Sequence, residues 1–125
     1  MPGLVEPEMR TYLKDCNTTA TNFYLKVAAG NAVFPYGIVF KVAPGRDYTH
    51  NSAGLYESVM QVSVWGQTYQ QAKTLANEVM RELEGWHTVD DDVQAVFLLS
   101  ESDLYEDDKK IFHIAMRFIV WHTFD

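Results

Sequence analysis

The fold class follows from residues 55–84, which read LYESVMQVSVWGQTYQQAKTLANEVMRELE. Residues 55–65 alternate in character, as in a strand that buries one of its two faces. The buried face would carry Tyr56, Ser58, Met60, Val62 and Val64. Residues 72–83 instead place apolar side chains every three or four positions, which is typical of an amphipathic helix. We therefore expect a strand at 55–65, a turn at Gly66 and a helix at 69–84.

Both ends of this helix carry sequence signals. Thr68 and Gln71 have the spacing of a capping box, in which each side chain bonds a backbone N–H that the first helical turn leaves unpaired. Gly85 can adopt the left-handed conformation that often follows the last turn of a helix.

Further strands are expected before and after this unit, at residues 23–27, 36–42, 93–100 and 110–123. The last of them alternates strictly, and one set of its side chains would face inward: Phe112, Ile114, Met116, Phe118 and Val120.

A short helix is expected at residues 6–16, because Met9, Leu13 and Cys16 fall on one stripe. Residues 43–54 are rich in turn formers and are expected to be a surface loop. The charged residues 101–109 are expected to connect two strands. The order of elements predicts an α+β fold. It would be a single domain over residues 1–125, with a mainly antiparallel sheet of about four to five strands packed with two helices.

Composition excludes several functions. The net charge is −7, which disfavours wrapping nucleic acid, since phosphate binding depends on clustered Lys and Arg. A single cysteine, Cys16, allows no internal disulfide. The first residues lack the basic and apolar regions of a signal peptide, and no apolar run approaches a membrane span, so we expect synthesis in a cytoplasm.

The sequence also lacks the patterns of catalysis. It has no nucleophile elbow, phosphate loop or dinucleotide-binding glycine motif. His113 and His122 are nine positions apart and so would lie on opposite faces of one strand, which disfavours a shared metal. Cys16 is expected to be a buried apolar side chain rather than a reactive thiol. We therefore expect no enzyme activity, no cofactor and no metal site.

One face of the predicted sheet is more apolar than solvent exposure requires. It would carry the following large side chains in addition to Val59 and Ala115: Trp65, Ile111, Ile119 and Trp121. A sheet covered by helices on one side should be polar on the other. Either the first helix covers this second face, or the face meets another subunit, as exposed apolar patches commonly do.

Two apolar residues and two acidic groups complete the candidate sites. Leu104 and Tyr105 stand inside the charged connection and would face a partner or a neighbouring subunit, unless they fold back onto their own domain. The acidic groups are Asp90, Asp91 and Asp92, and then Glu106, Asp107 and Asp108. They lack the alternating carboxylates and central glycine of a calcium loop, so solvated turns that repel or attract a partner are expected.

Three segments resemble the tail completion proteins of long-tailed bacteriophages, also called tail terminators or tail-to-head joining proteins. The first is the strand and helix of residues 55–76, in which LYESVMQVSVWG (55–66) is followed by TYQQAKTLA (68–76). The second is residues 34–40, FPYGIVF. The third is residues 102–122, where SDLYED precedes an alternating strand that ends on an aromatic pair. The resemblance covers the chain from Phe34 to the C-terminus.

This resemblance implies a structural role in the virion, at the junction of tail and head. Such proteins form a ring, typically of six subunits, that seats on the tail tube, stops its polymerisation and presents a surface to the head-completion or connector protein. DNA would pass through the lumen without sequence-specific binding, and acidic walls would keep it from adhering. The partners implied are further copies of the chain, the major tail tube protein and the head-completion protein, with no membrane.

Two other hypotheses remain open. The chain could be a head-closure or connector adaptor of a phage or prophage, which would not cap tube ends. It could also be a small cytoplasmic ligand-binding α+β domain, which would need a pocket lined by inward polar groups.

Overall fold

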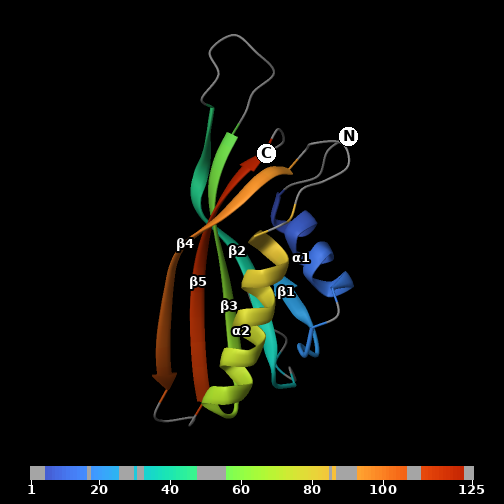
Figure 1. Ribbon diagram of the computed structural model, residues 1–125, viewed down its shortest axis with the longest axis vertical. Helices are drawn as coiled ribbons and strands as arrows, with labels where there is room; N and C mark the ends of the chain where they lie inside the picture. Colours follow the sequence, from blue (N-terminus) through green and yellow to red (C-terminus); the bar gives the residue numbers. More distant parts are fainter. Residues whose placement is uncertain are drawn as a thin grey trace.

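Strand β3 lies in the middle of a five-stranded sheet in the computed structural model of the chain (Figure 1). The structure describes residues 5–16, 18–25, 30, 33–47, 56–84, 86, 93–106 and 111–122. The described elements are α1 (Val5–Asp15), β1 (Phe23–Leu25), β2 (Tyr36–Asp47), β3 (Tyr56–Gly66), α2 (Tyr69–Glu84), β4 (Val93–Glu106) and β5 (Ile111–His122).

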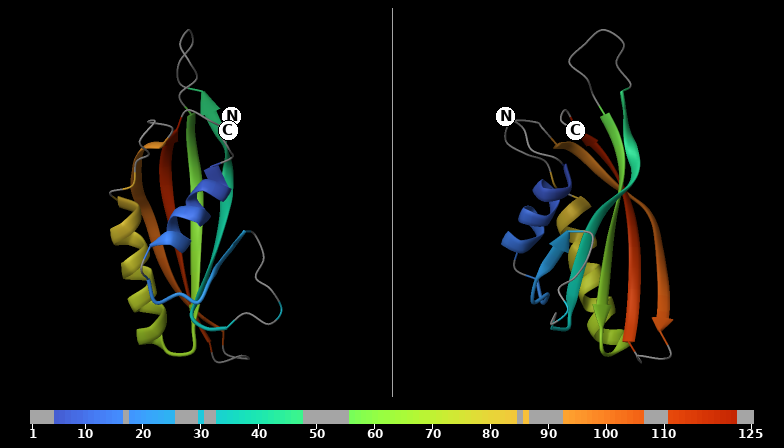
Figure 2. Two further views of the ribbon diagram at one scale, coloured as in Figure 1. Left: turned by 90° about the vertical axis from the view of Figure 1, so that its right-hand side faces the viewer. Right: turned by 180° about the vertical axis from the view of Figure 1, so that it is seen from behind.

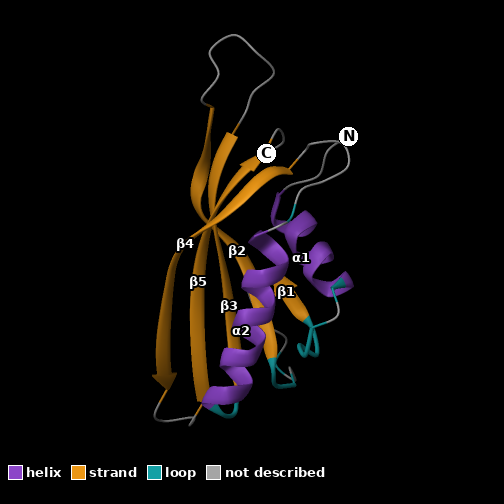
Figure 3. Cartoon of the chain, in the orientation of Figure 1, coloured by secondary structure: helices purple, strands orange, loops and turns teal. Residues whose placement is uncertain are grey.

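The strand order is β1-β2-β3-β5-β4. The short strand β1 pairs with β2 in parallel, and every other pair is antiparallel. The fold is therefore α+β, as the sequence predicts, and Figure 3 distinguishes the described helices from the strands of the sheet.

Both helices lie on the same side of the sheet (Figure 2). The core between the two layers combines Met9 and Leu13 of α1 with the apolar stripe of α2 and the inward side chains of β3 and β5. The inward set predicted for β5 is confirmed: Ile114, Met116, Phe118 and Val120 are buried, and Phe112 packs at the border of the core. Among the described residues, no helix is long and apolar enough to cross a membrane.

The predicted bounds of α2 are confirmed, and its N-terminal cap is a variant of the predicted one. Thr68 Oγ1 accepts a hydrogen bond from Gln71 N at 3.1 Å, as a capping box requires. The Gln71 side chain accepts from Gln67 N at 2.8 Å, so it satisfies the residue before the cap. The turn is tight because Gly66 meets the helix: a Cβ at Gly66 would lie 2.7 Å from Ala72 N.

Two predicted connections are wrong. Residues 43–47, expected in a loop, continue β2 to Asp47, and two register shifts accommodate them at Ala43 and before Arg46. Such irregularities are where a strand tolerates a proline, because no ladder donor is needed there. Residues 101–106, expected in a charged connection, extend β4 along β5 as far as Glu106.

We expect truncation of a core side chain to lower the free energy of unfolding much more than truncation of an exposed side chain does. Leu75→Ala and Phe118→Ala should each lower the free energy of unfolding by about 2–5 kcal/mol, because both side chains are fully buried and their loss leaves a cavity. Phe97→Ala is the matched control, since Phe97 is 58% exposed and should cost no more than about 0.5 kcal/mol. Thermal or denaturant melts that place Phe118→Ala within the range of Phe97→Ala would contradict the assignment of faces.

Candidate assembly surface

The sheet has one face that neither described helix covers, and we call it the outer face. Its side chains follow from the pairing register, because side chains alternate between the two faces along each strand. Among the residues whose side chains the structure describes, the outer face is formed by Tyr36, Ile38, Phe40, Glu57, Val59, Gln61, Ser63, Trp65, Ala95, Phe97, Ser100, Ser102, Leu104, Ile111, His113, Ala115, Arg117, Ile119 and Trp121. This arrangement settles one alternative left by the sequence, because α1 packs on the same side as α2 and does not cover this face.

A row of aromatic rings crosses the outer face from strand to strand. Trp65 of β3 is stacked between Tyr36 of β2, at 5.4 Å between ring centroids, and His113 of β5, at 4.2 Å. Tyr36 also meets Tyr24 of β1 edge-on at 6.0 Å. Each ring therefore shields its neighbours, which explains why Trp65 and His113 are only half-exposed on an uncovered face.

A hollow of about 370 Å³ lies beside this row, between β3, β5 and β4. Its lining is mostly polar and consists of Gln61, Ser100, Ser102, Leu104, His113, Ala115 and Arg117. Arg117 Nε donates to Gln61 Oε1 at 3.2 Å, and Gln61 Nε2 donates to Ser63 Oγ at 2.8 Å. The outer face is therefore apolar with a polar centre.

Strand β4 forms one edge of the sheet, and its two halves differ in character. Near its middle a register shift follows Leu98, and three consecutive apolar side chains are exposed there: Phe97 by 58%, Leu98 by 38% and Leu99 by 54%. Exposed apolar side chains on an edge strand favour pairing or packing with another chain. This cluster is an interface candidate that the sequence alone did not reveal, because three adjacent apolar residues read equally well as buried strand.

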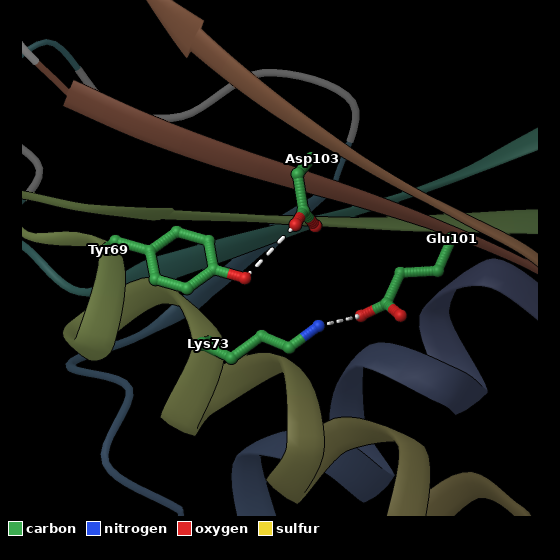
Figure 4. A network of polar contacts seen from close by, with 4 residues as sticks. All are labelled: Tyr69, Lys73, Glu101 and Asp103. Atoms are coloured by element: carbon green, nitrogen blue, oxygen red, sulfur yellow. Dashed lines mark hydrogen bonds and ion pairs between the residues drawn. The ribbon is translucent and has the colours of Figure 1, made fainter.

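Two acidic residues of β4, Glu101 and Asp103, lie on the opposite side, toward α2 (Figure 4). Lys73 Nζ forms an ion pair with Glu101 at 3.1 Å, and Tyr69 donates a hydrogen bond to Asp103 at 3.1 Å. The hydrogen bond to Glu101 raises the pKa of Lys73 and so favours its charged form. These contacts hold the side chains of Glu101 and Asp103, in the C-terminal half of β4, toward α2 and away from the hollow.

Five of the six predicted interface residues share the outer face. Trp65, Ile111, Ile119 and Trp121 are half-buried, and Leu104 is 49% exposed beside His113. Tyr105 lies on the helix side instead, where its ring meets Phe112 at 4.7 Å, although it also remains 49% exposed. Leu104 and Tyr105 lie on different faces because they are neighbours in β4, and successive side chains of a strand point in opposite directions.

The predicted acidic sites fall mainly outside the described residues. Asp90, Asp91, Asp92, Asp107 and Asp108 are not described, and of Glu106 the structure gives only its backbone position at the end of β4. Their role as repulsive or lumen-lining groups therefore stays a prediction.

The histidines and the cysteine occupy unrelated environments. His122 is fully buried, and its Nε2 lies 2.6 Å from Ser58 Oγ. His122 and His113 lie on opposite faces of the sheet. Cys16 is only half-buried, not fully buried as predicted, because it lies just after the end of α1, where its thiol donates to Glu82 Oε2 at 3.5 Å. Burial and the nearby Glu82 raise its pKa, which lowers the thiolate fraction. The described part of the chain contains no group of three or more His, Cys, Asp or Glu placed to hold a metal ion.

Comparison with known proteins identifies the family of the chain. Residues 7–123 match the family of tail completion protein gp17. The chain belongs to this family. It is therefore a structural protein of the phage tail, and its location is the tail of the virion. No curated protein sequence matches the chain.

A solved structure shows the same fold. A chain in the virion of a native gene transfer agent particle superposes with a TM-score of 0.71 at 16% sequence identity, over 91% of this chain and 90% of that one. At this identity the likeness concerns the fold alone.

Separate substitutions at Leu104 and Tyr105 should now give different results. Leu104→Asp places a charge on the outer face and should weaken association while leaving the melting temperature nearly unchanged, because Leu104 is half exposed. Tyr105→Ser removes the contact with Phe112 and should lower stability slightly. Yields of completed tails and thermal melts measure both effects, and a normal yield with Leu104→Asp would remove this residue from the interface.

Proposed function

We propose that copies of this chain form a ring of six subunits that caps the tail tube, ends tail polymerisation and forms the interface between tail and head. Its partners would be the major tail tube protein on one side and the head-completion or connector protein on the other. The proposal rests on membership of the tail completion family, together with one structural observation: an apolar sheet face that no described helix covers.

A closed ring needs two different surfaces on each copy, because contacts related by rotation are head to tail. The outer face and the β4 edge are two such surfaces. The outer face offers Trp65, Ile111, Ile119 and Trp121 of β3 and β5. The β4 edge offers Tyr105, the Phe97–Leu99 cluster and Leu104, and its Phe97 and Leu104 also belong to the outer face. Aromatic and apolar side chains of this kind are enriched at the centres of protein interfaces.

Charge would oppose the same assembly. Six copies at −7 each carry a formal charge of −42, and the lumen would hold DNA of the same sign. Asp90, Asp91 and Asp92, or Glu106, Asp107 and Asp108, would be the main repulsive or lumen-lining groups. Repulsion falls off over a Debye length of roughly 8–10 Å at 0.1–0.15 M salt, whereas apolar burial persists.

Assembly should therefore depend on ionic strength. We expect mostly monomer in dilute, low-salt buffer, and rings at higher salt, with magnesium or on tail tubes. Replacing Asp90, Asp91 and Asp92 by Asn should move ring formation to lower salt. The control is the triple variant Glu8→Gln, Asp15→Asn, Glu84→Gln, which removes the same charge from exposed positions on the two helices.

Sedimentation velocity across a salt and magnesium series measures this dependence. If the control variant shifts the transition as far as the Asp90–Asp92 variant does, net charge alone governs assembly and the acidic segment has no special place. A protein that stays monomeric throughout, and on tail tubes, would contradict the ring itself.

Electron microscopy of the assembly mixed with purified tail tubes separates the proposed function from that of a head-closure adaptor. A terminator should bind at tube ends and stop their growth, whereas an adaptor should leave growing ends uncapped.

A further inference from the structure

The hollow on the outer face has an unusual charge for this chain. Acidic residues outnumber basic ones by 17 to 10, yet none of the residues that line the hollow is acidic and one, Arg117, is a cation. Alternation along β4 explains this, because Glu101 and Asp103 point to α2 while Ser100 and Ser102 point into the hollow. Among the residues whose side chains are described, the carboxylate that shares the outer face is Glu57, four residues from Gln61 along β3 and therefore about 13 Å away. The backbone of Glu106 pairs with Ile111, which is six residues from Arg117 along β5.

The guanidinium of Arg117 is held in place but is not neutralised. Its Nε–H is bonded to Gln61, whose own amide is anchored on the buried Ser63. Within the described part of the chain no ion pair involves Arg117, and its side chain is exposed. A guanidinium fixed through Nε still presents its terminal N–H groups, which suit the two oxygens of a carboxylate.

The neighbours of Arg117 also suit a carboxylate. The hydroxyls of Ser100 and Ser102 can donate hydrogen bonds to the same oxygens, and Leu104 and Ala115 supply apolar wall. A volume of about 370 Å³ has room for one acidic side chain and its adjoining backbone.

We propose that this hollow binds a carboxylate side chain from a second copy of the chain, with Arg117 as the charged contact and Gln61 as the residue that positions it. This inference rests on the proposed ring and names one contact within it. A second copy is the occupant that the charges favour: the chain is strongly acidic, and the hollow offers a cation on the same face that carries the apolar interface residues. The pair would also give the interface a register, which apolar contacts alone do not.

Three substitutions with the same net charge test the proposal. Arg117→Gln removes the cation, Gln61→Glu supplies a carboxylate from within the same chain, and Arg81→Gln removes an exposed cation from α2 on the opposite layer. Each changes the net charge from −7 to −8, so general repulsion is matched. Thermal melts of all three should be close to that of the wild type, because the three side chains are at least partly exposed.

Sedimentation at a salt concentration where the wild type assembles gives the result. Arg117→Gln and Gln61→Glu should each weaken self-association about tenfold relative to Arg81→Gln, as expected for a lost hydrogen bond to a charged group. Arg117→Lys, which keeps the charge without the forked geometry, should restore part of the loss.

Equal association of Arg117→Gln, Gln61→Glu and Arg81→Gln would overturn this inference and leave the ring proposal intact. Normal self-association of Arg117→Gln combined with a loss of tube capping by the same variant would also overturn it, because the occupant of the hollow would then be another tail protein. Failure of the wild type to associate under any condition would overturn the ring and the inference together.

Discussion

Strands β3 and β5 pair without a register shift from Tyr56 opposite His122 to Gly66 opposite Phe112, and this pairing determines the face of every central side chain. A slip of one residue would exchange the two faces and put the apolar core set in solvent. The helices can cover only one side of this ladder, and both pack there. The covered side takes Met60, Val62 and Phe118, which are fully buried. The other side is left with aromatic and apolar side chains that shield one another incompletely, which suits a protein that completes its packing by assembly.

The two halves of the edge strand β4 differ in how well they are protected against pairing with other chains. Charged side chains that point inward along an edge discourage unwanted pairing. Glu101 and Asp103 do so in the C-terminal half of β4, where Lys73 and Tyr69 of α2 bind them. The other half has no such protection among its described side chains and exposes the Phe97–Leu99 cluster. The unprotected half therefore fits a specific, permanent contact better than free solvent.

Much of the fold could be predicted from the spacing of apolar residues alone. The switch from alternation to helical spacing located β3 and α2, and strict alternation gave the inward set of β5. The ends of β2 and β4 were missed because turn formers at Pro44 and Gly45, and charges at Glu101 and Asp103, are poor strand residues in isolation. Pairing with a long neighbouring strand overrides that local preference. The same error grouped Tyr105 with Leu104, although alternation along β4 turns the two side chains in opposite directions. The polar centre around Arg117 could not be foreseen, because it depends on the register between three strands.

Hydrogen–deuterium exchange on the free and the tail-assembled protein tests the central claim that the side of the sheet without helices, with its β4 edge, is the assembly surface. Amides on the open side of β4 lack a sheet partner in the free chain and gain cover on assembly. Peptides from Val93–Glu106 should then exchange more slowly in the assembled form, while peptides from α1 should exchange at the same rate in both forms. Slowed exchange confined to α1 and α2, with unchanged β4, would contradict the claim and place the interface on the helical layer.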